Sequence, residues 1–92
     1  MRGETVKAVL YFSAKWCMPC KKLRPQVERA CEAAGVPFEF HDIDAEPDFA
    51  FAHGIQHVPT IMLRDGSTVV QRIPQGAPAA SIRKQIRDWA LD

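Results

Sequence analysis

Residues 8–20 read AVLYFSAKWCMPC, and this stretch decides the fold of the chain. An apolar run ends at Phe12, a short turn follows, and Cys17 and Cys20 open a helical pattern. The predicted first strand, residues 5–12, is nearly all apolar in its second half, as expected of a central strand covered on both faces. The two cysteines are therefore predicted to stand where a strand ends and a helix begins.

The segment after the cysteines has the pattern of one amphipathic helix, about residues 17–34. Its apolar positions recur at spacings that place them on one face. They are Leu23, Val27, Ala30, Cys31 and Ala34. Pro25 should kink this helix, because it has no backbone N–H to donate to the carbonyl of Lys21. Gly35 is a suitable end, and Cys31 is expected to be a small core residue.

The rest of the chain alternates between strand and helix patterns. We expect a strand, a short helix, two strands and a final helix at residues 36–43, 47–53, 59–64, 67–73 and 78–91. Asp65-Gly66 is a hairpin signal, so the last two strands should be antiparallel, whereas the first two, joined by a helix, should be parallel. The predicted fold class is α/β, in the order β-α-β-α-β-β-α, with a four-stranded mixed sheet and helices on both faces.

Length and composition indicate a single domain over residues 1–92. An apolar fraction of 47% and a charged fraction of 25% are ordinary for a globular protein. A net charge of +1 gives no electrostatic reason to expect nucleic-acid or membrane binding. The cysteine count of three is odd, and no secretory apolar stretch follows Met1. We therefore expect a cytoplasmic monomer, in which a Cys-x-x-Cys pair is catalytic or metal-binding.

The spacing of Cys17 and Cys20 suits disulfide exchange. Positions i and i+3 of a helix lie on one side, with Cα atoms about 5–6 Å apart, a separation that a disulfide tolerates. Cys17 would begin the helix and be accessible, and the unpaired N–H groups there favour its thiolate. Pro19 fits the first turn because no intrahelical hydrogen bond is lost. Cys17 would attack a substrate disulfide, and the more buried Cys20 would resolve the mixed disulfide.

A zinc site is the main rival interpretation, and the spacing argues against it. Zinc needs two further ligands, for which the candidates are Cys31, His41, His53 and His57. Cys31 lies about 16 Å beyond Cys20 along a helix, too far to share one tetrahedron. The sequence has no second Cys-x-x-Cys and no His-x-His pair. We predict no metal and no bound cofactor beyond the Cys17–Cys20 disulfide itself.

Several spaced motifs resemble those of the thioredoxin family. Residues 12–22 read FSAKWCMPCKK and are similar to the family's active-site segment, which usually reads W-C-G-P-C-K. Pro25 falls where the family's helix carries its kinking proline. Residues 42–47 (DIDAEP) and 54–60 (GIQHVPT) resemble its D-x-D…P and G-I-x-x-[IV]-P-T segments. The correspondence covers about residues 6–91 and implies a thioredoxin fold.

The resemblance also implies a substrate surface. Pro59 should be cis and lie beside the two sulfurs, where the backbone of Val58 would pair with an extended substrate segment. The apolar rim of this surface would consist of Trp16, Met18, Val58, Pro59 and the Gly76-Ala77 loop.

The departures from the family pattern concern size and the surroundings of the second cysteine. The chain lacks the N-terminal strand and helix of full-length thioredoxins, and Met18 replaces the usual glycine. The family's buried aspartate aligns with Tyr11, and the lysine that pairs with it aligns with Phe40. Two aromatic residues would thus lie beneath the pentapeptide in place of an ion pair. Tyrosine is a poor base at neutral pH, so we predict that water or the departing thiolate takes the proton of Cys20.

The activity implied by the resemblance is protein-disulfide reduction. The partners would be disulfide-containing proteins and an NADPH-dependent thioredoxin reductase. One alternative is a glutaredoxin-like electron donor to ribonucleotide reductase, which the small size favours. Trp16, the Met18-Pro19 pair and the absence of paired glycines after Pro59 argue against it. A second alternative is a thioredoxin-fold accessory subunit with a non-redox binding role.

Overall fold

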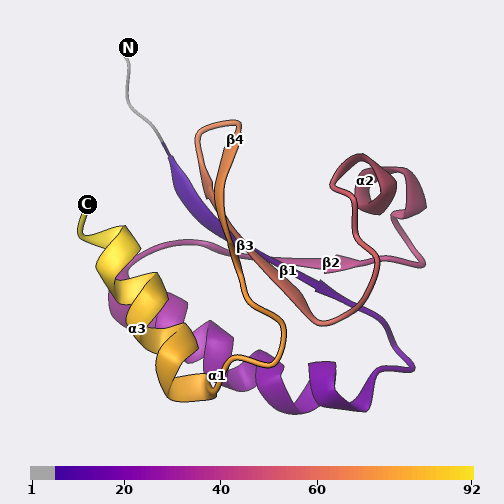
Figure 1. Ribbon diagram of the computed structural model, residues 1–92, viewed down its shortest axis with the longest axis horizontal. Helices are drawn as coiled ribbons and strands as arrows, with labels where there is room; N and C mark the ends of the chain where they lie inside the picture. The colour runs from indigo at the N-terminus through magenta and orange to yellow at the C-terminus, as the bar shows by residue number, and fades with distance from the viewer. Residues whose placement is uncertain (1–5) are drawn as a thin grey trace.

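The computed structural model describes residues 6–92 and contains four strands and three helices in that part of the chain (Figure 1). The elements are β1 (Lys7–Ser13), α1 (Met18–Ala34), β2 (Phe38–Asp42), α2 (Pro47–Ala52), β3 (Thr60–Asp65), β4 (Thr68–Ile73) and α3 (Ala79–Ala90). Their order is the predicted β-α-β-α-β-β-α. Thr5, the first residue of the predicted first strand, lies outside the described residues. The second strand is shorter than the predicted residues 36–43.

The sheet has the order β2-β1-β3-β4, so β1 is an inner strand with neighbours on both sides. It pairs parallel with β2, with Leu10 opposite Glu39, and antiparallel with β3, with Leu10 opposite Met62. β3 and β4 are antiparallel. The predicted α/β fold with a four-stranded mixed sheet is confirmed, including the parallel first pair and the antiparallel hairpin. Its turn is Gly66-Ser67 and not the predicted Asp65-Gly66, because Asp65 still pairs with Thr68.

Helices cover both faces of the sheet, as predicted. Figure 1 shows α1 and α3 together on one side and α2 on the other. Successive side chains of β1 point to opposite faces, so Val9 and Tyr11 join the core beneath α1 and α3, while Leu10 and Phe12 join a second core that also contains Phe49 of α2. All four of these β1 side chains are fully buried. The apolar run at residues 8–12 is therefore explained by burial on two sides.

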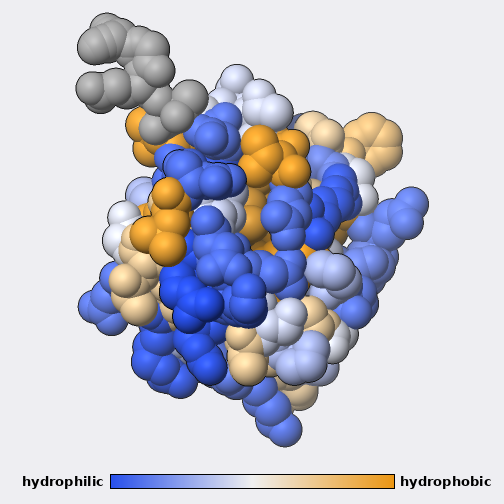
Figure 2. All heavy atoms as spheres, turned by 60° about the vertical axis from the view of Figure 1, so that its left-hand side comes forward, coloured by the Kyte–Doolittle hydropathy of each residue, from blue (hydrophilic) through white to orange (hydrophobic). Residues whose placement is uncertain are grey.

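The surface is mostly polar on the side that carries α3 and the C-terminus. Figure 2 shows hydrophilic side chains over most of this face, with the hydrophobic ones in small, separate groups. Exposed apolar residues elsewhere in residues 6–92 include Trp16 and Met18 beside the cysteine pair, and Phe51 on α2. No helix within residues 6–92 is both long enough and apolar enough to cross a bilayer.

An ion pair crosses β1 on the α2 side of the sheet. Arg64 of β3 donates to both carboxylate oxygens of Glu39 on β2, at 3.2 and 2.5 Å. His41 Nε2 lies 3.1 Å from the same carboxylate. Partial burial of Glu39 opposes its ionisation, but these hydrogen bonds outweigh that effect and hold the pKa of the Glu39 carboxyl below its ordinary value.

Replacing Glu39 by glutamine is expected to remove an acid-sensitive part of the stability. A carboxyl whose pKa is lowered by folding stabilises the native state above its unfolded pKa of about 4.3, and this contribution is lost as the pH falls through the folded value. The gap in urea midpoint between the wild type and Glu39→Gln should therefore be widest near neutral pH and close below about pH 4. A gap that stayed constant down to pH 3 would contradict this assignment.

Candidate functional site

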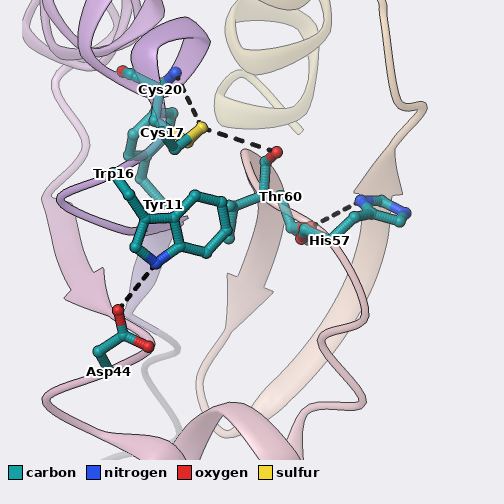
Figure 3. Close-up of a disulfide and its surroundings, with 8 residues drawn as sticks. Tyr11, Trp16, Cys17, Cys20, Asp44, His57 and Thr60 are labelled. Atoms are coloured by element: carbon teal, nitrogen blue, oxygen red, sulfur yellow. Dashed lines mark hydrogen bonds between the residues drawn. A yellow bond between two sulfur atoms is a disulfide. The ribbon is translucent and has the colours of Figure 1, made fainter.

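The two cysteines of the central motif form a disulfide at the start of α1. Cys17 and Cys20 are bonded through their sulfur atoms, and their Cα atoms are 5.3 Å apart. This separation lies within the range predicted from helix geometry. The close-up in Figure 3 shows the pair above the end of the sheet, between Trp16 and Thr60.

Cys17 is the N-cap of α1 and not its first helical residue, because the helix begins at Met18. Its Sγ accepts a hydrogen bond from the backbone N–H of Cys20 at 3.3 Å (Figure 3). Pro19 lies in the first turn, and α1 continues through Pro25. Hydrogen bonds to a sulfur favour its anionic form, so this N-cap position suits a thiolate at Cys17.

The exposure of the two cysteines corrects one prediction. Cys20 is fully buried, as expected, but Cys17 was expected to be accessible and is only 5% exposed in the disulfide form. The reason is packing: Ala14 and the partly buried Val58 and Ile43 close around the pair. A substrate disulfide can therefore reach Cys17 only by fitting closely against the small part of this residue that stays exposed.

The loop before β3 supplies the other side of the site. The Val58–Pro59 peptide bond is cis, and the carbonyl oxygen of Val58 lies 3.8 Å from Cys17 Sγ. A disulfide sulfur has no proton to donate, so this contact can become a hydrogen bond only when Cys17 is reduced to a thiol. The buried Thr60 hydroxyl donates to the carbonyl of His57 at 2.6 Å and thereby ties the loop to the start of β3.

Tyr11 lies directly beneath the second cysteine. Its hydroxyl donates a hydrogen bond of 2.6 Å to the backbone carbonyl of Cys20. Burial raises the pKa of Tyr11 to about 12, an effect that the nearby Arg24 opposes and Glu28 supports. At neutral pH the hydroxyl therefore keeps its proton and serves as a structural donor.

Tyr11→Phe is expected to destabilise the protein while leaving its redox chemistry intact. The change removes the donor to the Cys20 carbonyl in a buried setting, which should cost about 1–3 kcal/mol in the free energy of unfolding. Disulfide-reduction rates should stay close to wild type, because a hydroxyl with a raised pKa is no base at neutral pH. Urea unfolding and a peptide-disulfide assay measure the two effects. Loss of most of the activity with an unchanged circular-dichroism spectrum would show that Tyr11 takes part in the chemistry.

Phe40 does not lie where its alignment with a buried lysine placed it. It belongs to β2, an edge strand of the sheet, and it is 38% exposed. Its ring stacks beside Tyr11 at 6.4 Å between centroids, and the guanidinium of Arg24 lies 3.8 Å from its centroid. The expected aromatic pair beneath the cysteines is thus one buried tyrosine and one surface phenylalanine covered by an arginine.

Trp16 makes a contact that the sequence did not indicate. The residue is 66% exposed, yet its indole N–H donates to the carboxylate of Asp44 at 3.0 Å (Figure 3). The two residues are 28 positions apart, and no local pattern marks such a pair. The motif Asp42-Ile43-Asp44 was the available signal, since it lies at the carboxyl end of β2, which runs parallel to β1.

A groove of about 370 Å³ lies on one side of α1 and reaches Pro19, the residue before Cys20. Pro19 and Leu23 of α1 form one wall, and Pro59, Gly76 and Ala77 form the other. Exposed Met18 and Trp16 flank the same end of α1. Of the predicted rim, Pro59, Gly76 and Ala77 line the groove. Trp16 and Met18 do not line it, and Val58 packs against the cysteines instead. An extended, apolar segment of another protein is the kind of ligand that fits such a groove.

The remaining cysteine, Cys31, is not part of this site. Cys31 is 1% exposed, and burial raises the pKa of its thiol to about 12, with Glu28 adding to the effect. It packs in the core between the sheet and α3. Within residues 6–92, no group of three or more His, Cys, Asp or Glu side chains is placed to hold a metal ion.

Comparisons with known proteins agree with this geometry. The family model described as Thioredoxin matches residues 2–88. A putative thioredoxin 2 of Streptomyces coelicolor is 38% identical over 72 residues, which cover 77% of this chain and 54% of the relative. A thioredoxin of Geodia cydonium is 35% identical over 80 residues, covering 86% of this chain and 76% of the relative. The chain thus spans about half the length of the first of these relatives and three quarters of the second.

Solved structures show the same fold. The oxidized form of mitochondrial thioredoxin 3 from Saccharomyces cerevisiae superposes with a TM-score of 0.78 and 31% identity, covering 89% of this chain and 77% of that one. Thioredoxin 1 of Thermosipho africanus has a TM-score of 0.82 at 18% identity, covering 89% and 92%. At that identity the second likeness speaks for the fold alone.

Proposed function

This chain belongs to the thioredoxin family, and we propose that it works as a thiol–disulfide oxidoreductase that reduces disulfide bonds in other proteins. The observation that carries this proposal is the Cys17–Cys20 disulfide at the N-terminus of α1, next to the groove. A disulfide that spans one turn at the N-terminus of a helix is placed for exchange with the sulfur atoms of another protein.

The reaction begins with the reduced pair. The Cys17 thiolate attacks one sulfur of the substrate disulfide, a Cys17–substrate bond forms, and the other substrate sulfur leaves as a thiolate. Cys20 then loses its proton and attacks Cys17 Sγ, which restores the Cys17–Cys20 disulfide and releases the second substrate thiolate. Two electrons pass from the protein to the substrate. Val58 and the groove hold the substrate segment while its sulfur lies in line with Cys17.

The oxidised pair must then be reduced again, and we infer that an NADPH-dependent thioredoxin reductase does this. The family assignment supports that partner over glutathione. One solved structure similar to this chain, at 31% identity, concerns the resolution of a yeast mitochondrial 1-Cys peroxiredoxin through glutathione and thioredoxin systems. A thiol peroxidase is therefore one kind of disulfide substrate to try. The role requires a reducing compartment such as the cytoplasm, where the dithiol form persists.

The test is insulin-disulfide reduction with two electron sources. One reaction contains NADPH and thioredoxin reductase, and the other contains glutathione with glutathione reductase and NADPH. We expect turnover with the first source and little with the second. Turnover with glutathione alone would favour the glutaredoxin-like role, and no turnover with either source or with dithiothreitol would overturn the proposal.

The reduction potential decides between a reductant and an oxidant. A reductase of this family should have a potential of about −270 mV, whereas a dedicated oxidant such as DsbA has one of about −120 mV. Met18 stands between the cysteines, a position that tunes this value. Equilibration with a dithiothreitol redox buffer, read by mass after alkylation, measures the potential. A value close to that of DsbA would overturn the direction of transfer proposed here.

A further inference from the structure

A second cavity lies against α1. The side chains of α1 that line it are different from those that line the groove. The volume of this cavity is about 280 Å³, and its walls include Ser13, Ala14, Cys20, Arg24, Phe40 and Asp42. The exposed Lys15 and Lys21 stand at its rim. One water molecule occupies roughly 30 Å³ in the liquid, so the space is large enough for several. The second cysteine of the pair and a carboxylate thus line the same cavity.

The reaction needs a proton acceptor at this place. Cys20 must lose its proton before it can attack Cys17, and the residue beneath it offers no base. The Tyr11 hydroxyl donates to the Cys20 carbonyl and keeps its own proton at neutral pH. Asp42 is the only carboxylate among the residues that line the cavity.

We propose that the proton of Cys20 passes through water in this cavity to the carboxylate of Asp42. Asp42 ends β2, where it lies opposite Ser13 of β1 in the parallel ladder, so its place at the wall of the cavity is fixed by the sheet. One carboxylate oxygen accepts the backbone N–H of Asp44 at 2.9 Å. The carboxylate is thus held in orientation while its second oxygen can take a proton.

The charges around the cavity favour the same transfer. Three of the residues that line the cavity are basic, Lys21 and Arg24 of α1 and Lys15 of the preceding loop, and Asp42 of β2 carries the negative charge. Arg24 is partly engaged by Glu28 at 3.5 Å and by the ring of Phe40. A thiolate at Cys20 is stabilised by the positive groups, while the proton leaves toward the carboxylate.

The transfer belongs to the mixed-disulfide stage. Cys20 exposes no surface while it is bonded to Cys17, and its sulfur can turn toward the cavity only once that bond is open. In the mixed disulfide, the Cys20 S–H bond breaks, its proton moves through water to Asp42, and the resulting thiolate attacks Cys17 Sγ. The Cys17–substrate bond breaks, the substrate thiolate leaves, and Asp42 later returns its proton to solvent.

Asp42→Asn tests this role with little structural change, because the amide oxygen can still accept the N–H of Asp44. Reduced protein is mixed with excess cystine peptide and quenched in acid, and the mixed disulfide is followed by mass. At pH 7 its decay should slow by at least about tenfold, since general bases commonly contribute about 10²–10⁴-fold. Above about pH 9 the difference should vanish, because the thiol, with an ordinary pKa of about 8.5, then ionises unaided.

Two controls separate this role from others. Asp48→Asn makes the same charge change on an exposed residue of α2 outside the cavity, and it should behave as wild type. In a Cys20→Ser background, Asp42→Asn should leave the rate of attack by Cys17 unchanged. The inference is overturned if Asp42→Asn matches Asp48→Asn, or if it slows decay equally at all pH values. It rests on the proposed function, but if the wild type reduces the peptide and Asp42→Asn does so equally well, only the inference fails.

Discussion

Cys17→Ser should reduce no protein disulfide above background, whereas Cys20→Ser should react once and stop. A serine hydroxyl is not ionised at neutral pH and forms no disulfide, so the first variant should lose on the order of 10³-fold or more in rate. The second variant keeps the attacking sulfur at the N-cap of α1 and lacks only the group that resolves the intermediate. The two positions are three residues apart, yet their variants should differ in kind.

Intact-protein mass spectrometry distinguishes these outcomes. When Cys20→Ser is incubated with excess cystine peptide, nearly every protein molecule should gain the mass of one half of the peptide. Treatment with a reductant should remove this added mass. Cys17→Ser should gain none at pH 7. Cys31→Ala is the matched control, because that thiol is buried and its pKa is raised to about 12. Attack through Cys20 in the Cys17→Ser protein, at a rate near that of the wild type, would reverse the assigned roles.

Phe12→Ala should be the most damaging of the simple core substitutions. Phe12 is fully buried in β1, and its ring packs between Phe49, His41 and His53 at centroid distances of 5.4–5.9 Å. Truncation of a buried phenylalanine typically costs about 3–5 kcal/mol. Small domains have a total stability of about 5–15 kcal/mol, so a large share of it would be lost.

Phe51→Ala provides the comparison for this prediction. Phe51 is the same residue type in the neighbouring α2, but it is 87% exposed. Its removal should change the free energy of unfolding by no more than about 0.5 kcal/mol. Urea titrations of the two variants, fitted with a common slope, give the difference. Equal effects of the two substitutions would mean that Phe12 does not anchor α2 to the sheet.

The fold was predictable because its signals are local. Alternation and apolar runs identify strands, and the central strand is recognisable because Val9, Leu10, Tyr11 and Phe12 are apolar in succession. The two-residue turn identifies the hairpin. The ends of β2 were less well predicted, because an edge strand is covered on one side and its half-exposed side chains carry a weaker pattern.

The site was only partly predictable, because much of it depends on residues far apart in the sequence. Helix geometry placed Cys17 and Cys20 correctly relative to each other. The exposure of Cys17 was wrong, because it depends on Val58 and Ile43 from other elements. The same holds for Phe40, which alignment placed in the interior although β2 lies at the sheet edge. The Trp16–Asp44 hydrogen bond joins two loops through space and has no sequence period.

The inner position of β1 has a consequence for synthesis on the ribosome. β1 is made before β3, so Leu10 can pair with Met62 only after α1, β2 and α2 have been added. Until then one backbone edge of the apolar strand β1 lacks the neighbour, β3, that it has in the folded sheet. An unpaired strand edge can form backbone hydrogen bonds with other nascent chains. For this protein, chaperone capture during translation should therefore centre on β1 and end when the β3–β4 hairpin emerges.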